Sequence, residues 1–118
     1  MTRTGMQAKS KVTKAQEISA EVSARFGSRD VFEIAEKACV KIVYESWYPT
    51  TIGEFEQKTK TILVNRRALE NNKNAEDLER IIIAHELGHF FAAGLNLDKT
   101  EEERFCHEFA KHLLANSI

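Results

Sequence analysis

Apolar residues recur at helical spacing near both ends of the chain and form strand-like runs in its middle. The first segment predicts an amphipathic helix over about 14–26. Its apolar positions are three or four residues apart: Ala15, Ile18, Val22 and Phe26. Thr13 and Gln16 have the spacing of an N-terminal capping box, and Gly27 supplies a stop, so both ends of this helix are marked in the sequence.

A short helix, a strand and a hairpin are expected next. Asp30 and Glu33 form a second capping box, which predicts a helix that turns its apolar residues inward. These residues are Val31, Ile34, Ala35 and Ala38. β-Branched and aromatic residues then occupy both parities over 40–47, which predicts a strand covered by helices on at least one face. Two further strands, 52–57 and 61–65, are separated by a short turn and predict a hairpin.

Two amphipathic helices close the chain. The polar loop 71–74 ends at Asn74, which is placed to cap a helix over about 75–93. One face of that helix is apolar and runs into two histidines: Leu78, Ile81, Ile82, His85, Gly88, His89 and Ala92. Thr100 and Glu103 have the spacing of a third capping box, and the helix that follows has an apolar face of its own. Its residues are Phe105, Cys106, Phe109, Ala110, Leu113 and Leu114.

This order of elements predicts an α+β domain with about four helices packed on a small three-stranded sheet. With 118 residues, the chain can bury one core but not two, so we expect a single domain over 13–118. Residues 1–12 hold a local excess of basic side chains, and we expect them to be a disordered lead-in. The formal net charge of -1 gives the whole chain no basic character of the kind that binds nucleic acid.

The sequence favours a cytoplasmic protein that is not inserted in a membrane. No apolar run approaches the roughly 18 residues that span a bilayer, and the N-terminus lacks the hydrophobic centre of a signal peptide. Two cysteines, Cys39 and Cys106, are too few for a disulfide framework. We expect Cys106 to be a core residue, because it falls on the apolar face of the last helix.

His85, Glu86 and His89 form an H-E-x-x-H motif on the predicted helix over 75–93. Residues four apart lie one turn apart on nearly the same face, so both imidazoles can bind one zinc ion. Glu86 is displaced by about 100 degrees from His85, where its carboxylate can take a proton from water. The alternative is a pair of core histidines satisfied by hydrogen bonds. The intervening acid, and the cost of a glycine at helix-interior position Gly88, favour a metal site.

A catalytic zinc ion takes a third protein ligand, and we expect this ligand on the last helix. At about 100 degrees per residue counted from Phe105, Glu102 and Glu103 fall within the apolar sector, whereas Glu108 falls outside it. Either of the first two glutamates can therefore supply the ligand. The alternative for Glu103 is that it only completes the predicted capping box. His112, at the far edge of the apolar sector, is expected to lie outside the site.

These residues resemble the ImmA/IrrE family of small zinc peptidases. In that family H-E-x-G-H is followed by E-x-W-C-N-x-F-A or a close variant. Here the stretch 103–110, ERFCHEFA, follows the motif after thirteen intervening residues, 90–102. A short helix before a strand, and a hairpin strand that ends at Asn65, extend the similarity over about residues 30–115. The resemblance implies that Glu103 is the third ligand, which completes a His2Glu zinc site.

The chain departs from the family pattern at two places. His107 stands where the family usually has asparagine, and Ala115 and Asn116 replace a common Met-Pro pair. His107 is four residues from Glu103 on the same helix face, so it is a catalytic candidate beside Glu86. It can orient a ligand, donate a hydrogen bond in the transition state or compete as a ligand. The alternative is a surface histidine.

The motif and the family resemblance together predict a zinc-dependent endopeptidase in which His85 and His89 hold Zn2+, with Glu103 as the third ligand that the resemblance implies, and Glu86 is the general base. A strand edge of the hairpin 52–65 is expected to hold the substrate extended. The resemblance implies a protein substrate, such as a helix-turn-helix repressor. Two alternatives stay open: a non-proteolytic zinc-containing binding module or toxin of a toxin-antitoxin pair, and a metal-free structural domain. A pure binder needs the histidines but not the base.

Overall fold

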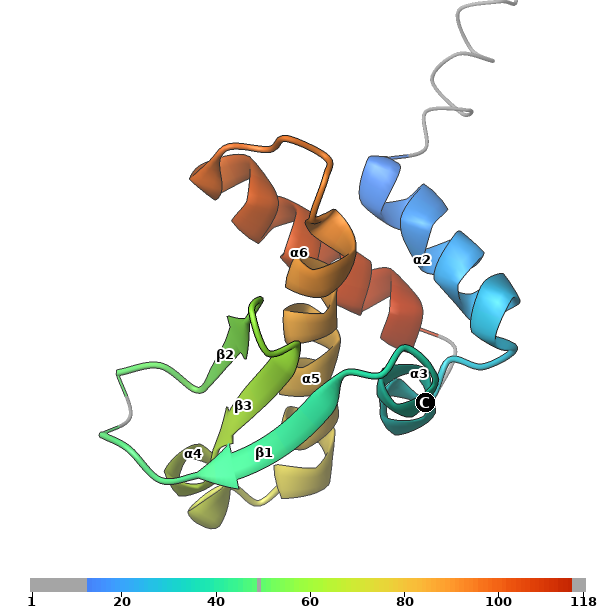
Figure 1. Cartoon of the computed structure of the whole chain (residues 1–118). Helices are drawn as coiled ribbons and strands as arrows, with labels where there is room; N and C mark the ends of the chain where they lie inside the picture. The colour runs from blue at the N-terminus through green and yellow to red at the C-terminus, as the bar shows by residue number, and fades with distance from the viewer. Residues whose placement is uncertain (1–12, 49, 116–118) are drawn as a thin grey trace, which may run out of the picture.

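The computed structural model of the chain describes residues 13–48 and 50–115. The lead-in expected over 1–12 and the departure at Asn116 lie outside these residues. The described elements are α2 (Lys14–Phe26), α3 (Val31–Lys37), β1 (Lys41–Glu45), β2 (Gly53–Glu56), β3 (Thr61–Asn65), α4 (Arg66–Glu70), α5 (Ala75–Ala92) and α6 (Lys99–Leu114), as Figure 1 shows. The predicted α+β class is confirmed. No helix in the described ranges is both long and apolar enough to cross a membrane.

The three strands form one mixed sheet in the order β1-β3-β2. β1 runs parallel to β3, and β2 runs antiparallel to it, with Gly53 opposite Val64 and Glu56 opposite Thr61. The predicted hairpin is therefore confirmed, although its first strand is shorter than the expected 52–57. β2 lies at one edge of this sheet, so one side of its backbone is free of strand partners within the sheet.

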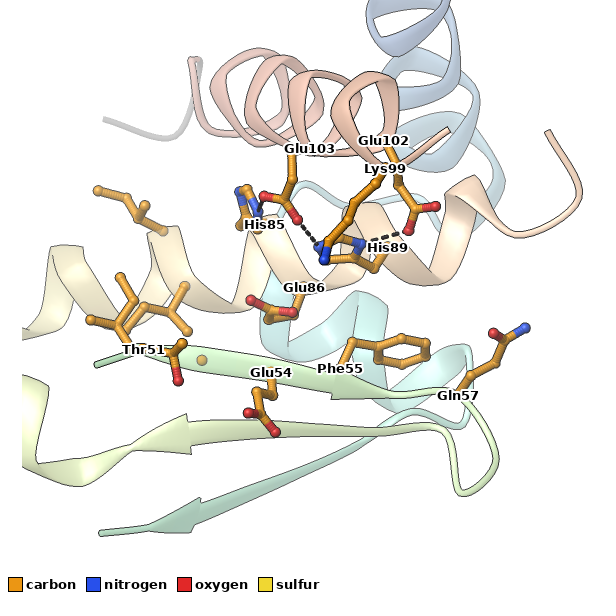
Figure 2. Close-up of a pocket in the computed structure, with 14 residues that line it drawn as sticks. Thr51, Glu54, Phe55, Gln57, His85, Glu86, His89, Lys99, Glu102 and Glu103 are labelled. Carbon is orange, nitrogen blue, oxygen red and sulfur yellow. Dashed lines mark hydrogen bonds and ion pairs between the residues drawn. The ribbon is translucent and has the colours of Figure 1, made fainter. Parts of the chain in front are cut away.

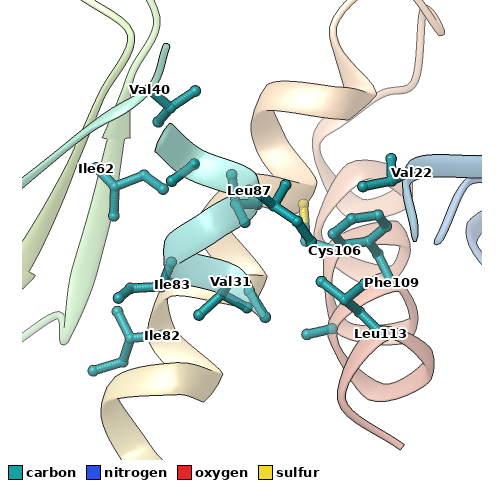
Figure 3. Close-up of a cluster of buried hydrophobic side chains, with 14 of the residues drawn as sticks. Val22, Val31, Val40, Ile62, Ile82, Ile83, Leu87, Cys106, Phe109 and Leu113 are labelled. Carbon is teal, nitrogen blue, oxygen red and sulfur yellow. The ribbon is translucent and has the colours of Figure 1, made fainter. Parts of the chain in front are cut away.

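Helix α5 lies between the sheet and α6, and α2 packs against α6 (Figure 1). The sheet contacts α5 through β2 and β3, and α3 packs against α5 as well. Side chains from all of these layers meet in one apolar core, part of which is drawn in Figure 3. Its fully buried members include Val31, Ile34, Ile62, Val64, Ile83, Leu87, Cys106, Phe109 and Leu113. The helix that carries both histidines is thus held from both sides.

Several helix ends follow their sequence signals. Thr13 caps α2 by accepting a hydrogen bond from the Gln16 N–H at 3.1 Å, and Gly27 ends it with a φ of 66 degrees. The Asp30 carboxylate caps α3 by accepting from the Phe32 N–H at 2.9 Å. These contacts fix the predicted positions of the first two helices.

One predicted capping box is wrong. The capping box of α6 pairs Asp98 with Glu101 rather than Thr100 with Glu103, so this helix begins two residues earlier than the Thr100 signal predicts. Asn74 occupies the predicted N-cap position of α5, but its side chain makes no capping hydrogen bond. The corrected capping box matters for the site, because the Glu103 carboxylate is not engaged in capping.

The short helix α4 is not predicted by the sequence pattern, and its cap is a buried polar residue. Asn65 is fully buried, and its side-chain oxygen accepts from the N–H groups of Arg67 at 3.1 Å and Trp47 at 3.3 Å. Its amide donates to the carbonyl oxygens of Trp47 at 3.2 Å and Thr51 at 2.9 Å. The Trp47 indole N–H also donates to the Thr51 hydroxyl at 3.0 Å. Asn65 therefore fixes the loop that leads into β2.

Candidate metal centre

Helices α5 and α6 pack tightly at a glycine within the H-E-x-x-H motif. A Cβ atom built on Gly88 would lie 2.9 Å from the Cα atom of Cys106, closer than real Cβ contacts come. The missing side chain therefore lets the two backbones approach. Because Gly88 lies between His85 and His89 in the chain, this approach brings both histidines beside the first turns of α6.

The two imidazoles converge on one carboxylate (Figure 2). His85 Nε2 lies 3.1 Å from Oε1 of Glu103, and His89 Nε2 lies 3.0 Å from its Oε2. The ring centroids of the two histidines are 5.4 Å apart. The structure thus places the three predicted ligands together, with the same nitrogen of each ring directed at Glu103.

The neighbouring glutamate contacts a different nitrogen. Oε2 of Glu102 lies 2.6 Å from Nδ1 of His89, on the side of the ring away from Glu103. When that Nδ1 carries the proton, it donates to Glu102 and leaves Nε2 free to bind a metal. The sequence left both glutamates open as ligands, and in the structure they take distinct positions.

Cys106 offers a further donor. Its sulfur and one ring nitrogen from each of His85 and His89 all lie within 4.8 Å of one another, so these three residues could hold a metal ion. The thiol is fully buried, as the sequence predicted, and this burial raises its pKa, with Glu103 and Glu102 adding to the effect. The sequence placed Cys106 in the core and missed its nearness to the histidines, which depends on the close approach at Gly88.

The donor set fits zinc. Imidazole nitrogen, carboxylate oxygen and cysteine sulfur are the three ligand types that zinc takes in proteins. Burial lowers the pKa of His85, against the opposing effect of Glu103, and this favours the neutral ring that can bind a metal.

Glu86 is buried beside this cluster, with only 7% of its surface exposed. Burial raises its pKa to about 7, and the charges of Glu103 and Glu54 add to this effect while His89 opposes it. A Cβ atom built on Gly53 of β2 would lie 3.3 Å from Oε2 of Glu86. The edge strand therefore passes directly beside the carboxylate.

Helix α6 carries two histidines of its own, His107 and His112. His107 is exposed and makes no hydrogen bond to the cluster in the described part of the chain, although its charge contributes to lowering the pKa of His85. His112 lies 3.6 Å from the carboxylate of Glu108, away from the cluster, as expected.

The cluster opens into a cleft of about 830 Å³. Its walls are β2 with the preceding loop and the first turns of α6, and α5 forms its floor (Figure 2). The lining residues are Thr51, Ile52, Gly53, Glu54, Phe55, Gln57, Ile81, Ile82, His85, Glu86, His89, Lys99, Glu102 and Glu103. All the predicted metal ligands and the predicted base thus face one cleft, and an edge strand borders it.

Comparison with known proteins does not assign the chain to a family. The sequence matches no protein-family model, and it has no significant match among curated proteins. The similarity to the ImmA/IrrE family therefore stays a prediction from the motif and its spacing.

Proposed function

We propose that this protein is a zinc-dependent endopeptidase that hydrolyses a peptide bond in a protein substrate. One observation carries the proposal: His85, His89 and Glu103 converge from two helices, with Glu86 buried beside them, in a cleft along an edge strand. Two imidazoles, a carboxylate and an adjacent glutamate are the groups that metal-assisted hydrolysis needs.

Each side chain has a distinct task in this mechanism. His85, His89 and Glu103 hold the zinc ion, which when bound supplies Lewis-acid polarisation of the substrate carbonyl. Glu86 takes a proton from the attacking water and passes it to the departing amine. Its position beside both histidines and the edge strand suits that transfer.

The free edge of β2 binds the substrate backbone. β2 pairs only with β3 in the described sheet, so its other side presents N–H and C=O groups toward the cleft. An extended peptide can add to such an edge as a further strand. This would carry its backbone past Glu86, because Gly53 of the same strand adjoins that carboxylate.

A protein regulator is the substrate class that we propose from the family resemblance, with a helix-turn-helix repressor as the first candidate. The formal net charge of -1 agrees with action on a protein rather than on nucleic acid.

The test replaces the proposed base while keeping its shape. Glu86→Gln should lose about 10²- to 10⁴-fold in kcat/KM while still binding about one zinc ion per chain. Cleavage is measured by mass spectrometry on a peptide library prepared from a digested cell lysate, and zinc by elemental analysis. Glu76→Gln is the matched control, because Glu76 is exposed on the same helix and far from the motif in sequence.

Two outcomes would overturn the proposal. Full peptidase activity in Glu86→Gln would show that the cleavage comes from elsewhere. A native protein that binds no zinc when the metal is supplied would remove its chemical basis.

A zinc-containing binding module is the second candidate, and Cys106 is the observation that favours it. If Cys106 joins His85, His89 and Glu103, the metal has four protein ligands and no open position, as in structural zinc sites. Cobalt in place of zinc tests this, because a thiolate ligand gives an intense charge-transfer absorption. A band present in the native protein and absent in Cys106→Ala would favour the binding module, and its absence from both would favour the peptidase.

A further inference from the structure

Two large apolar side chains are exposed inside the cleft. In the described part of the chain, the exposed large hydrophobic residues are Phe32, Tyr48, Ile52 and Ile81. Ile52 is 46% exposed and Ile81 is 48% exposed, and both line the cleft. Single exposed apolar residues are ordinary on a protein surface. Ile52 and Ile81 differ from that case, because they line one cleft from two different elements.

The positions of these isoleucines follow from a backbone contact. A Cβ atom built on Gly53 would lie 2.5 Å from Cγ2 of Ile82, so the start of β2 lies directly against α5 at this point. Ile52 and Ile81 each adjoin one partner of that contact in the chain. They therefore come from the strand wall and the helix floor to the same end of the cleft.

This apolar end lies next to the proposed reaction centre. Ile81 is one helical turn before His85 on α5, which is a rise of about 6 Å. Figure 2 shows Thr51 and Gln57 at opposite ends of the strand wall, with His85 nearer the Thr51 end. An extended peptide advances about 3.3 Å per residue, so this end is within two residues of the bond at the metal cluster.

The other end of the cleft is mixed in character. Phe55 and Gln57 line it on the strand wall, and Glu102 lines it from α6 (Figure 2). The cleft thus has a direction, with an aliphatic end before His85 and an end beyond His89 that holds an aromatic ring and polar groups. A peptide that binds along β2 meets both.

We propose that Ile52 and Ile81 form a subsite for a large aliphatic or aromatic side chain of the substrate, within two residues of the cleaved bond. This inference rests on the proposed peptidase function and specifies its substrate class. The two isoleucines offer apolar surface that is already partly exposed, and a substrate side chain would cover it. One methylene group in an apolar pocket changes kcat/KM by about 10- to 200-fold, so such a subsite should favour leucine over alanine by at least about tenfold.

The test compares cleavage sites and matched peptides. The native protein cleaves the peptide library described above, and large apolar residues should be enriched within two positions of the cleaved bonds. A pair of synthetic peptides that contain one such site, with leucine or alanine at the enriched position, then gives the ratio of kcat/KM. We expect a leucine preference of at least about tenfold.

Two variants and one control assign that preference to the cleft. Ile81→Gln keeps a good helix former at an exposed position, and Ile52→Thr keeps a β-branched residue before the strand. Each should bring the leucine-to-alanine ratio of kcat/KM toward one, chiefly by lowering kcat/KM for the leucine peptide. Phe32→Gln changes an exposed apolar residue of α3, outside the cleft, and should keep the native ratio.

The outcomes separate this inference from the proposed function. If the native protein cleaves nothing, the proposed function fails and the subsite fails with it. If cleavage depends on Glu86 but shows no apolar enrichment, only the subsite is wrong. A folded Ile81→Gln and a folded Ile52→Thr that both keep the native leucine preference would also overturn it.

Discussion

Two neighbouring glutamates on α6 contact the histidines in different ways. Glu103 reaches Nε2 of both rings, whereas Glu102 reaches Nδ1 of His89 alone. Consecutive helical residues point about 100 degrees apart, so only one of the two can face the point where the imidazoles converge. The other is placed to hold a ring in the orientation that a ligand needs.

We predict that Glu102→Ala weakens zinc affinity by about 10- to 100-fold, because His89 loses the acceptor for its Nδ1 proton. Glu102→Gln should weaken it less, since the amide oxygen can still accept that hydrogen bond. Affinity is measured by competition with a chromophoric chelator. Arg104→Ala, an exposed change on the same helix, serves as the control. Native affinity in Glu102→Ala would contradict the role assigned to Glu102.

The sequence could predict part of this cluster and not the rest. The H-E-x-x-H spacing alone brings two histidines to one helix face. Which residue of α6 meets them depends on how two helices cross, and azimuth on one helix does not fix that. For this reason Glu102 and Glu103 could not be separated from the residue pattern, and the nearness of Cys106 was missed.

At the scale of elements, local signals predicted the helices and strands better than their boundaries. The caps at Thr13 and Asp30 are formed where their spacing predicts them. Asp98 and Thr100 both offer capping-box spacing before α6, and the structure uses Asp98. Helix α4 carries no buried residue, so no apolar pattern in the sequence predicted it. Its cap, Asn65, depends on the loop contacts of a folded chain.

The close contact between α5 and α6 predicts that alanine at position 88 destabilises the protein, which is opposite to its effect in an isolated helix. Replacing a glycine by alanine in a free helix stabilises it by about 1 kcal/mol. Gly88→Ala should instead lower the free energy of unfolding by about 1–3 kcal/mol, because the new Cβ would meet the backbone of Cys106. Urea unfolding measures the change, with Glu21→Ala at an exposed position of α2 as control. A stabilised Gly88→Ala would show that the helices do not pack as described.

At the scale of the whole molecule, the cleft is built from a small part of the fold. Its lining comes from β2 with its flanking residues, the middle of α5 and the start of α6. Among the described elements, α2, α3 and β1 contribute no lining residue to it. A bound metal would join α5 to α6 across the same contact that the core forms, so metal binding should stabilise the entire domain.

Zinc removal should therefore lower the melting temperature. A ligand present at 100 times its Kd adds about 2.7 kcal/mol to the free energy of unfolding, which corresponds to a rise of roughly 10 °C for a domain of this size. Thermal melts with zinc and with a chelator measure the difference. His89→Ala should show little of it, since one ligand is gone. Identical native melts in the two conditions would contradict a metal that bridges the helices.

The hydrogen bond between Trp47 and Thr51 places an intrinsic fluorophore beside the cleft. Trp47 is the single tryptophan of the chain, and its indole is tied to a residue that lines the cleft. The fluorescence of an indole depends on the polarity around it. A peptide that settles along β2 near Thr51 would therefore shift the emission of one known residue. Binding to the cleft can thus be followed without any label, even in a variant that cannot cleave.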